Sequence, residues 1–460
     1  MSRSLNPSIF REYDIRGLVG RDLTAESVRA VGLAYGSFLR ERGIKESIVG
    51  RDNRLSSFAY SRILRDALNS TGVDVVDVGM VTTPVFYFSR IKYGVQGGMM
   101  VTGSHNAPEY NGFKLAYGTD TLYGDGIQEI RRIAEVGRFA RGSGHYLYED
   151  PIPSYVEDLA YRVRLGPKRV FAVVDAGNGS SGLIARRVLE RLGAQFEEMY
   201  FEPDGTFPNH HPDPTQPSEM EDLIDRVLRS GADLGIAFDG DADRIGVVDA
   251  SGRLVFGDEL QAVFWQEIMP KYPGTLALIE VKCSQALVDV VRELGGRPQF
   301  TRTGHSLIKA RMRETGALFT GEMSGHMFFR DEYYGFDDAI YAAARLLRLL
   351  SNSSESLSEK ISRIPQYHST PELRISCPDE TKFAIVEDAT RKFAQNYEVI
   401  TVDGVRVLFP DGWGLLRASN TQPALVLRAE AKTVQGLSQI KKAIEDVLGG
   451  YSVIGTIEWD

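Results

Sequence analysis

Three segments of the 460-residue chain repeat one pattern, and this repetition limits the folds open to the protein. Each segment contains a β-branched apolar strand, a short polar loop, a stretch of helical periodicity that ends at a glycine, and a second strand. Strands and helices that alternate in this way build mostly parallel sheets, so each repeat predicts its own α/β layer. The segments are residues 47–79, 169–205 and 275–304.

Glycines mark the expected ends of the repeated helices, where a C-cap residue adopts the left-handed conformation. They are Gly72, Gly193 and Gly295. Downstream in each repeat a further strand opens into an unusual loop, which reads T-G-S-H-N, D-G-D-A-D-R and G-E-M-S-G-H in turn. Ligands of open α/β sheets bind beyond the carboxyl ends of strands, so these loops are the predicted functional positions.

The last part of the chain follows a different pattern. A polar tract at residues 351–360 is the best linker candidate, and beyond it a strand, a helix, further strands and a terminal helix predict an α+β domain. The predicted fold is therefore three similar α/β domains with mixed, mostly parallel sheets, followed by a C-terminal α+β domain. The expected domains are residues 1–150, 151–252, 253–365 and 366–460.

Charge and composition exclude several classes of function. A net charge of -9 and a pI near 5.5 provide no basic field for nucleic acid or an anionic membrane. The chain has two cysteines, Cys283 and Cys377, in no metal-binding spacing, which suits reduced thiols. Its first residues lack a signal-peptide core, and arginines interrupt the apolar stretch at residues 341–350. We expect a soluble, cytoplasmic protein.

The D-G-D-A-D-R loop carries the strongest chemical signal. Asp239, Asp241 and Asp243 alternate directly after an apolar strand, and carboxylates this close repel one another unless a cation neutralises them. Oxygen ligands favour Mg²⁺ or Ca²⁺ over zinc. An EF-hand would need Gly and Glu where Arg244 and Ala250 stand, so that motif is excluded. The alternative is an acidic, solvated turn.

The T-G-S-H-N loop raises the question whether Ser104 is a turn residue or a nucleophile. It lies next to His105, but neighbours within a loop rarely face each other, and the loop lacks the G-x-S-x-G elbow of serine hydrolases. The position of the loop at the end of a strand favours chemistry, whereas its Gly, Asn and Pro content also suits a plain turn.

Two further loops could bind phosphate. R-A-S-N-T-Q-P at residues 417–423 offers a guanidinium with hydroxyl and amide donors, although a satisfied turn is the simpler interpretation. D-A-G-N-G-S-S-G at residues 175–182 resembles a phosphate cradle before a helix. The other two repeats lack this second motif, so we interpret it as an ordinary connection between strand and helix.

Taken together, the motifs resemble those of the α-D-phosphohexomutases. The chain carries E-Y-D-I-R-G, T-G-S-H-N with N-G-F-K, D-G-D-A-D-R, G-E-M-S-G-H and R-A-S-N-T in the family's order, over essentially its whole length. Met323 in G-E-M-S-G-H resembles the bacterial phosphomannomutase/phosphoglucomutase branch, since phosphoglucosamine mutases usually have Gln there. Ala107 departs from the family, which often has proline at that position.

The resemblance implies a reaction and its cofactors. Ser104 would be a phosphoserine that donates its phosphoryl group to a hexose monophosphate, forming a hexose 1,6-bisphosphate that turns over and returns its other phosphate. Mg²⁺ held by Asp239, Asp241 and Asp243 would take an oxygen of the Ser104 phosphate as a further ligand. Mannose or glucose phosphates would be the substrates, and the four domains would surround a central cleft.

The resemblance also implies roles for other residues. Those expected around the transferred group, with His326 as the proton-transfer candidate, are Ser104, His326, Lys114, Arg16, Arg244 and His305. Those expected to bind substrate are Tyr13, His105, Lys282, Thr303, Gly304, Glu322, Ser324, Arg417, Ser419, Asn420 and Thr421.

Other functions stay open from the sequence. A phosphomonoesterase would also need a metal and a phosphorylatable serine, but it would not need the second phosphate site at residues 417–421. A phosphoglucosamine mutase is the alternative within the family, and a noncatalytic sugar-phosphate sensor would have no use for Ser104. The sequence leaves open the choice between mannose and glucose, and between a monomer and a dimer.

Overall fold

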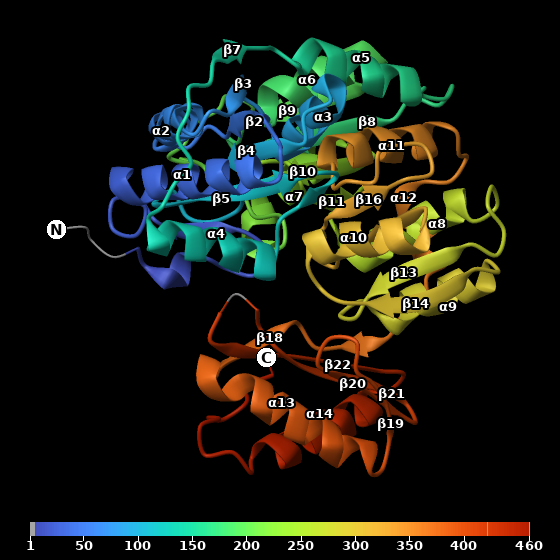
Figure 1. Cartoon of the computed structure of the whole chain (residues 1–460). Helices are drawn as coiled ribbons and strands as arrows, with labels where there is room; N and C mark the ends of the chain where they lie inside the picture. The colour runs from blue at the N-terminus through green and yellow to red at the C-terminus, as the bar shows by residue number, and fades with distance from the viewer. Residues whose placement is uncertain (1–4, 421, 460) are drawn as a thin grey trace. The chain divides into compact units, whose positions relative to one another are not determined.

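The computed structural model describes residues 5–420 and 422–459 and divides the chain into two compact units. The first unit runs to Leu260 and also contains Ser324–Lys360. The second contains Gln261–Met323 and the chain from Ile361 onward. Each unit is described by itself below, and Figure 1 labels the elements.

The N-terminal sheet of the first unit is mixed. Its strands are β1 (Ile15–Leu18), β2 (Glu46–Arg51), β3 (Asp74–Met80), β4 (Gly97–Val101), β5 (Tyr110–Tyr117), β6 (Asp120–Thr121) and β7 (Tyr146–Tyr148). The order is β1-β5-β4-β2-β3-β7, with β6 beside β5. The central strands β4, β2 and β3 are parallel, and β5 runs antiparallel to β4. The carboxyl ends of β2 and β4 therefore meet at one edge of the sheet.

The helices of this region pack on that sheet. They are α1 (Ala25–Glu41), α2 (Ser57–Ser70), α3 (Thr83–Tyr93) and α4 (Asp125–Val136), after a 3-10 turn η1 (Pro7–Ile9). Val31, Leu64 and Ile130 of α1, α2 and α4 form one buried core with Val49 and Phe113 of the sheet. Burial of these side chains is the main force that holds the layer together.

The second sheet of the first unit repeats the plan. Its strands are β8 (Phe171–Asp175), β9 (Gln195–Met199), β10 (Leu234–Phe238), β11 (Ile245–Asp249) and β12 (Leu254–Val255), in the order β12-β11-β10-β8-β9. β8 is parallel to both β9 and β10, so the ends of β8 and β10 are neighbours. The other elements are α5 (Ile152–Arg162), α6 (Gly182–Leu192), η2 (Pro217–Met220), α7 (Glu221–Ser230), β16 (Met327–Phe329) and α11 (Ala339–Ser351).

The second unit begins within α8 and contains the third repeat. The elements here are α8 (Gly257–Ile268), β13 (Leu276–Glu280), α9 (Gln285–Glu293), β14 (Arg297–Thr301), α10 (His305–Thr315) and β15 (Phe319–Gly321). β13 and β14 pair in parallel. Glu280 and Thr301 consequently lie opposite each other at the end of this pair.

An antiparallel sheet completes the second unit. Its strands are β17 (His368–Ser369), β18 (Leu373–Ser376), β19 (Glu398–Ile400), β20 (Val405–Phe409), β21 (Gly412–Ala418) and β22 (Ala424–Ala431). The helices α13 (Asp379–Ala394) and α14 (Val434–Leu448) cover one face of it (Figure 1). Ile385 and Ile444 of these helices share a core with Val405, Leu416 and Leu427 of the sheet.

The predicted fold class is confirmed: α/β layers precede a C-terminal α+β domain. Gly193 caps α6 in the left-handed conformation, and Gly72 and Gly295 adopt it one residue beyond the caps of α2 and α9. The linker prediction for residues 351–360 is wrong in its second half, because α12 (Leu357–Ser362) forms there. Its apolar residues Leu357 and Ile361 are buried, so tertiary packing outweighs the polar composition.

Within the described residues, no helix combines the length and apolarity needed to cross a membrane.

Candidate active site

The loop that follows β4 presents Ser104 in a strained conformation. Ser104 has a φ of 50°, which lies in the left-handed region that residues other than glycine rarely adopt. Its side chain is buried, and its Oγ donates to Asp239 Oδ2 at 2.9 Å. Non-glycine residues in such conformations cluster at functional sites, where the surrounding structure holds them in place.

Arg54, directly beyond β2, is the main support of this loop. Its guanidinium donates to the carbonyl oxygens of Ser104 at 2.7 Å, Ala107 at 2.7 Å and Tyr110 at 3.0 Å, and also to that of Asn106. Asp52 lies 3.3 Å from Arg54 Nε and accepts from the Gly103 amide at 3.1 Å. A planar group with a fixed fork of donors can hold several carbonyls at once, so Arg54 fixes the path of the loop.

The acidic loop after β10 brings the three predicted metal ligands together. Single ligand atoms of Asp239, Asp241 and Asp243 lie within 4.8 Å of one another, and all three residues are buried. Ala242 between them has a φ of 56°, a second strained position in the same region. Asp239 Oδ1 accepts hydrogen bonds from the main-chain amides of Asp243 at 3.0 Å and Arg244 at 3.1 Å.

Lys114 of β5 partly neutralises this acidic cluster. Its Nζ lies 2.9 Å from Asp241 Oδ2 and also contacts Asp243 Oδ2. Burial alone would lower the pKa of Lys114, but the two carboxylates raise it well above its usual value. Burial and the nearby Asp243 and Asp241 raise the pKa of Asp239 well above its usual value, so one ammonium does not balance the cluster.

The oxygens of the cluster fit a hard cation. Asp241 Oδ1 and Asp243 Oδ1 are buried without a hydrogen-bond partner among the described residues. Buried carboxylate oxygens are costly unless they are paired, and an all-oxygen donor set suits Mg²⁺. Asp241 Oδ2, by contrast, accepts from Thr83 at 2.6 Å and Thr102 at 3.1 Å, so Oδ1 is the oxygen that could bind a cation.

His326 and Arg244 lie beside the cluster. Arg244 Nε donates to His326 Nε2 at 3.0 Å, and His326 Nδ1 lies 3.0 Å from Asp337 Oδ2. Nε2 of His326 is therefore the acceptor for Arg244, and Nδ1 is the ring nitrogen that faces Asp337. Asp243, His326 and Asp337 form a second group with metal-ligand spacing.

Other predicted residues of the first unit lie near the Ser104 loop. Arg16 Nη1 donates to Asn106 Oδ1 at 2.6 Å, and Arg16 Nη2 pairs with Asp14 at 2.5 Å. His105 Nδ1 is 3.2 Å from Ser104 Oγ. Burial and the cations Arg244 and Arg16 lower the pKa of His105 well below its usual value, so its imidazole is neutral. Tyr13 precedes β1, and Ser324 precedes β16; both are partly buried.

The second unit gathers its own predicted residues around Glu280, at the end of β13. Lys282 Nζ lies 3.6 Å from Glu280 and 2.9 Å from Glu372. Thr303 Oγ1 donates to Glu280 at 2.6 Å. The Gly304 amide donates to Glu322 Oε1 at 2.8 Å, and the Met323 amide donates to Glu280 Oε2 at 3.2 Å. His305 begins α10 and lies 3.2 Å from Lys309.

The loop between β21 and β22 carries the last predicted residues. Arg417 Nη2 pairs with Asp403 Oδ2 at 3.0 Å, and the same oxygen accepts from the Thr303 amide at 3.1 Å. Lys382 holds the loop by donating to the carbonyls of Ser419 at 2.6 Å and Gln422 at 3.0 Å. Asn420 lies on this loop, whereas Thr421 lies outside the described residues.

Sequence reasoning missed several residues that position these groups. Asp52 and Arg54 follow the first strand of the first repeat, so comparison of the repeats could have found them. Thr83, Asp337, Glu372 and Asp403 gave no signal, because each approaches its partner only through the fold. In the second unit, the carboxylates that pair with Lys282 and Arg417 are the most important of these omissions.

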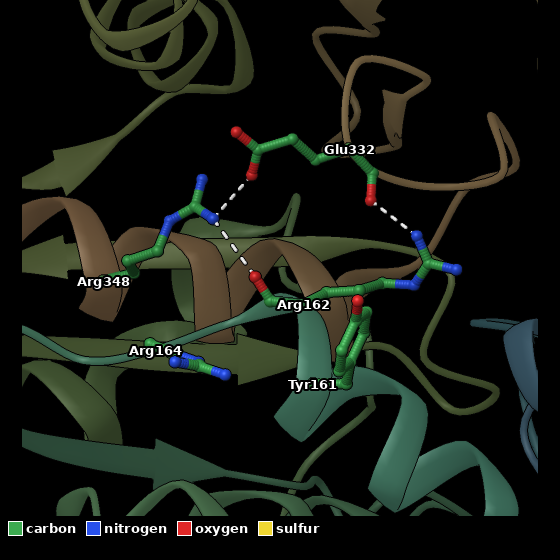
Figure 2. Close-up of a pocket in the computed structure, with 5 residues that line it drawn as sticks. All are labelled: Tyr161, Arg162, Arg164, Glu332 and Arg348. Carbon is green, nitrogen blue, oxygen red and sulfur yellow. Dashed lines mark hydrogen bonds and ion pairs between the residues drawn. The ribbon is translucent and has the colours of Figure 1, made fainter.

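A pocket of about 440 Å³ lies apart from these residues, at the end of α5 and beside α11. Figure 2 shows its lining: Tyr161, Arg162, Arg164, Glu332 and Arg348. Arg348 pairs with Glu332 at 2.6 Å, and Arg162 pairs with Asp158 at 2.8 Å, so two of the guanidiniums already have carboxylate partners. None of the predicted site residues lines this pocket.

Comparison with known proteins shows the same four-part organisation. The chain matches domains I, II and III of phosphoglucomutase/phosphomannomutase, each described as alpha/beta/alpha, and then the C-terminal domain. The matched residues are 7–141, 153–252, 256–367 and 372–447.

Individual relatives agree over nearly the whole length. The phosphomannomutase/phosphoglucomutase of Pseudomonas aeruginosa is 45% identical over 447 residues, which cover 97% of this chain and 96% of that protein. The phosphoglucomutase of Neisseria gonorrhoeae is 42% identical over 450 residues, 97% of each chain. The crystal structure of a phosphoglucomutase/phosphomannomutase family protein from Burkholderia thailandensis superposes with a TM-score of 0.91 at 42% identity, covering 97% of this chain and 98% of that one.

These similarities define the class first: the chain is an α-D-phosphohexomutase, an enzyme that interconverts hexose phosphates. Within that class, it belongs to the phosphoglucomutase/phosphomannomutase family.

Proposed function

We propose that this enzyme moves a phosphoryl group between O1 and O6 of mannose or glucose, through a phosphoserine at Ser104 and a hexose 1,6-bisphosphate. The observation that carries the proposal is the hydrogen bond of 2.9 Å from Ser104 Oγ to Asp239, one of three clustered carboxylates. A serine that carries a dianionic phosphoryl group needs a cation beside it, and the clustered carboxylates are the groups that would hold that cation.

The transfer conserves phosphate in two steps. In the first, the bond between phosphorus and Ser104 Oγ breaks, a bond to the free hydroxyl of the hexose monophosphate forms, and a base removes the hydroxyl proton. The resulting bisphosphate turns over, and its other phosphoryl group passes back to Ser104 Oγ while the sugar oxygen is reprotonated. Lys114, Arg16 and Arg244 would stabilise the transferring charge, and His326 would move the proton.

The metal in this proposal is Mg²⁺, held by Asp239, Asp241 and Asp243 together with a phosphate oxygen of phospho-Ser104. When bound, it draws negative charge from the phosphoryl group and so lowers the barrier to transfer.

The remaining residues would recognise the substrate. Glu322 and Ser324 would bind the O3 and O4 hydroxyls, which mannose and glucose share, and His105 and Tyr13 would lie near the transferred group. The residues that would hold the phosphate not in transfer are Arg417, Ser419, Asn420 and Thr421. Thr303 and Gly304 would also bind substrate, and Lys282 and His305 would lie near the transferred group. Arg417 would contribute bidentate phosphate binding.

We further propose that the chain comprises four domains at 1–150, 151–252, 253–365 and 366–460, with one functional loop from each. Cys283 and Cys377 are both buried and form no disulfide among the described residues, which suits a cytoplasmic enzyme. We propose that it works as a monomer or dimer.

The first experiment supplies mannose 1-phosphate, glucose 1-phosphate and glucosamine 1-phosphate separately, with Mg²⁺ and catalytic 1,6-bisphosphate, and follows 6-phosphates and free phosphate. We expect comparable turnover of the first two and poor turnover of glucosamine 1-phosphate, since Met323 offers its ammonium no strong partner. Stoichiometric release of free phosphate would instead indicate a phosphomonoesterase, and a preference for glucosamine 1-phosphate would indicate a phosphoglucosamine mutase.

The second experiment tests Ser104 itself. Ser104→Ala removes the covalent carrier, so we expect nearly all mutase activity to disappear while binding of sugar phosphates stays close to wild type. Intact-mass measurement of the wild type should show a phosphate adduct that maps to Ser104. An adduct at another residue, or an active Ser104→Ala enzyme, would refute the phosphoserine.

A further inference from the structure

The glycine-rich loop at residues 175–182 connects β8 to α6 and packs against the acidic loop. Ser180 donates to the Gly240 carbonyl oxygen through its amide at 3.1 Å and through its Oγ at 3.2 Å. A Cβ on Gly179 would lie 2.8 Å from the same oxygen, closer than a real side chain can approach. The loop therefore supports the residue that stands between Asp239 and Asp241.

His210 and Asp175 hold this loop from the other side. His210 Nε2 lies 2.9 Å from Asp175 Oδ2, and the Gly177 amide donates to Asp175 Oδ1 at 2.7 Å. Asn209 Nδ2 donates to Asn178 Oδ1 at 2.7 Å. Asn178 has a φ of 54°, so these bonds hold a backbone conformation that costs energy. Asp175 is 1% exposed, and its carboxylate pairs with His210.

The packing leaves little room between this loop and Ser104. A Cβ on Gly177 would lie 3.0 Å from Pro212, and one on Gly240 would lie 2.6 Å from the Ser104 carbonyl oxygen. Asn53, next to Arg54, donates to the Asn178 carbonyl at 2.7 Å. A shift of the 175–182 loop would therefore be transmitted both to the acidic loop and to the support of Ser104.

Each of the three repeats has a carboxylate at, or one residue beyond, the end of its first strand that accepts from a loop amide. In the first repeat, Asp52 beyond β2 accepts from Gly103 in the Ser104 loop at 3.1 Å. In the third, Glu280 at the end of β13 accepts from Met323 in the G-E-M-S-G-H loop at 3.2 Å. Asp175 ends β8 in the second repeat. Asp52 and Glu280 thus bond the functional loop itself, whereas Asp175 bonds the Gly177 amide of the loop that packs on it.

We infer that His210 and Asp175 are a positioning pair, which sets the geometry of the three metal-ligating aspartates and of Ser104 through the 175–182 loop. The inference rests on the proposed metal site. Burial alone would lower the pKa of His210, but Asp175 raises it to about 9, so His210 is protonated at neutral pH. Neither residue touches the acidic cluster directly, and their effect passes through Gly177, Ser180 and Gly240.

The test measures Mn²⁺ binding to the full-length enzyme by electron paramagnetic resonance, together with kcat and KM for glucose 1-phosphate. His210→Gln keeps a donor but loses the charge, and Asp175→Asn keeps the shape of the acceptor. We expect each to weaken Mn²⁺ binding roughly tenfold and to lower kcat with KM little changed, as removal of outer partners does at metal sites. The double variant should be no worse than either single variant, because the two residues act as one unit.

The matched control is Arg229→Gln, which breaks an exposed ion pair with Asp225 at 2.9 Å within α7. It should leave the Mn²⁺ Kd and kcat unchanged. If His210→Gln and Asp175→Asn lower only the unfolding temperature and bind Mn²⁺ like the wild type, the pair is merely structural and the inference is wrong.

Two further outcomes distinguish a failure of the proposed metal site from a failure of the positioning role of His210 and Asp175. If the wild type itself does not bind Mn²⁺ at Asp239, Asp241 and Asp243, the proposed metal site fails. If the pair variants do not fold, Ser180→Ala decides, since it deletes only the Oγ bond to Gly240. It should then weaken Mn²⁺ binding about twofold to fivefold, the effect of losing one hydrogen bond. An unchanged Kd would overturn the inference.

Discussion

At the scale of single residues, buried charges hold the loops that present the reactive groups. Arg54 is 2% exposed, and its guanidinium donates hydrogen bonds to carbonyl oxygens of the Ser104 loop. A buried cation is tolerated only when carboxylates and carbonyls replace its water, so the position demands both the charge and the forked shape of arginine.

Arg54→Lys should therefore destabilise the enzyme despite keeping the charge. A lysine has one nitrogen, which cannot reach all the carbonyls that Arg54 bonds, and each buried oxygen left unpaired costs about 1–3 kcal/mol. We expect a loss of about 3 kcal/mol in unfolding free energy and a lower level of phosphorylated Ser104. Denaturant unfolding and intact-mass measurement check both. Arg42→Lys, at an exposed pair with Glu129, is the control and should cost under about 1 kcal/mol.

Asp241→Asn tests the cation at the same scale. Loss of one ligand charge should weaken metal binding, and excess Mg²⁺ should restore part of the activity. The substitution leaves an oxygen that can still accept from Thr83 and Thr102, so the fold should survive. Activity that is indifferent both to this change and to chelation would mean that the acidic loop is only a turn.

At the scale of elements, the order of the strands in a sheet determines which loops come into contact at the strand ends. β8 and β10 are parallel neighbours, with Asp175 in register with Ala237, so their carboxyl ends place the 175–182 loop against the acidic loop. The connection that the sequence predicts is confirmed, whereas its packing against Gly240 depends on sheet order, which the loop residues do not encode.

The His210–Asp175 pair predicts a pH dependence for this element. The pKa of His210 is about 9 in the folded protein, above the roughly 6.5 of an unfolded histidine. Its contribution to stability is therefore complete below about pH 6.5 and is lost as pH rises through about 9. Glu219, whose carboxylate lies 4.0 Å from His210 Nδ1, also raises the pKa of His210. The ring of Tyr200 packs against the imidazole in an edge-on arrangement.

The measurement compares unfolding temperatures of wild type and His210→Gln. The difference should be largest at about pH 6.5 and should shrink toward zero by about pH 10. Differences between the two proteins remove the titration of all other groups. A difference that stays constant across this range would show that His210 is not ionised in the folded state.

At the scale of the whole molecule, the proposed metal site lies in one unit and the fluorescent tryptophans lie in the other. The acidic cluster lies in the first unit, and the three tryptophans, Trp265, Trp413 and Trp459, all lie in the second. Each unit has its own buried core, which permits separate unfolding transitions.

Mg²⁺ should consequently stabilise one transition selectively. At a hundredfold excess over Kd, a bound ion contributes about 2.7 kcal/mol to the state that binds it. We expect the transition seen by circular dichroism for the first unit to rise by several degrees relative to chelator, while the midpoint seen by tryptophan fluorescence stays in place. Equal shifts by both probes would show that the units unfold together.

The linear order of residues was sufficient for everything that depends on local periodicity and spacing. The repeats predict the α/β layers, glycines that tolerate left-handed backbone mark helix ends, and Asp239, Asp241 and Asp243 converge because they alternate on one short loop. The family resemblance, which rests on the same motifs, is confirmed by relatives over nearly the whole chain.

Contacts between segments far apart in the chain needed the tertiary structure. Arg54 and Ser104, Lys282 and Glu372, and His210 and Asp175 are partners only because the tertiary fold brings their segments together. α12 likewise forms within a polar tract because burial of Leu357 and Ile361 outweighs local composition. Long-range packing depends on many weak contacts across the whole fold, and a short window of sequence contains too few of them to predict it.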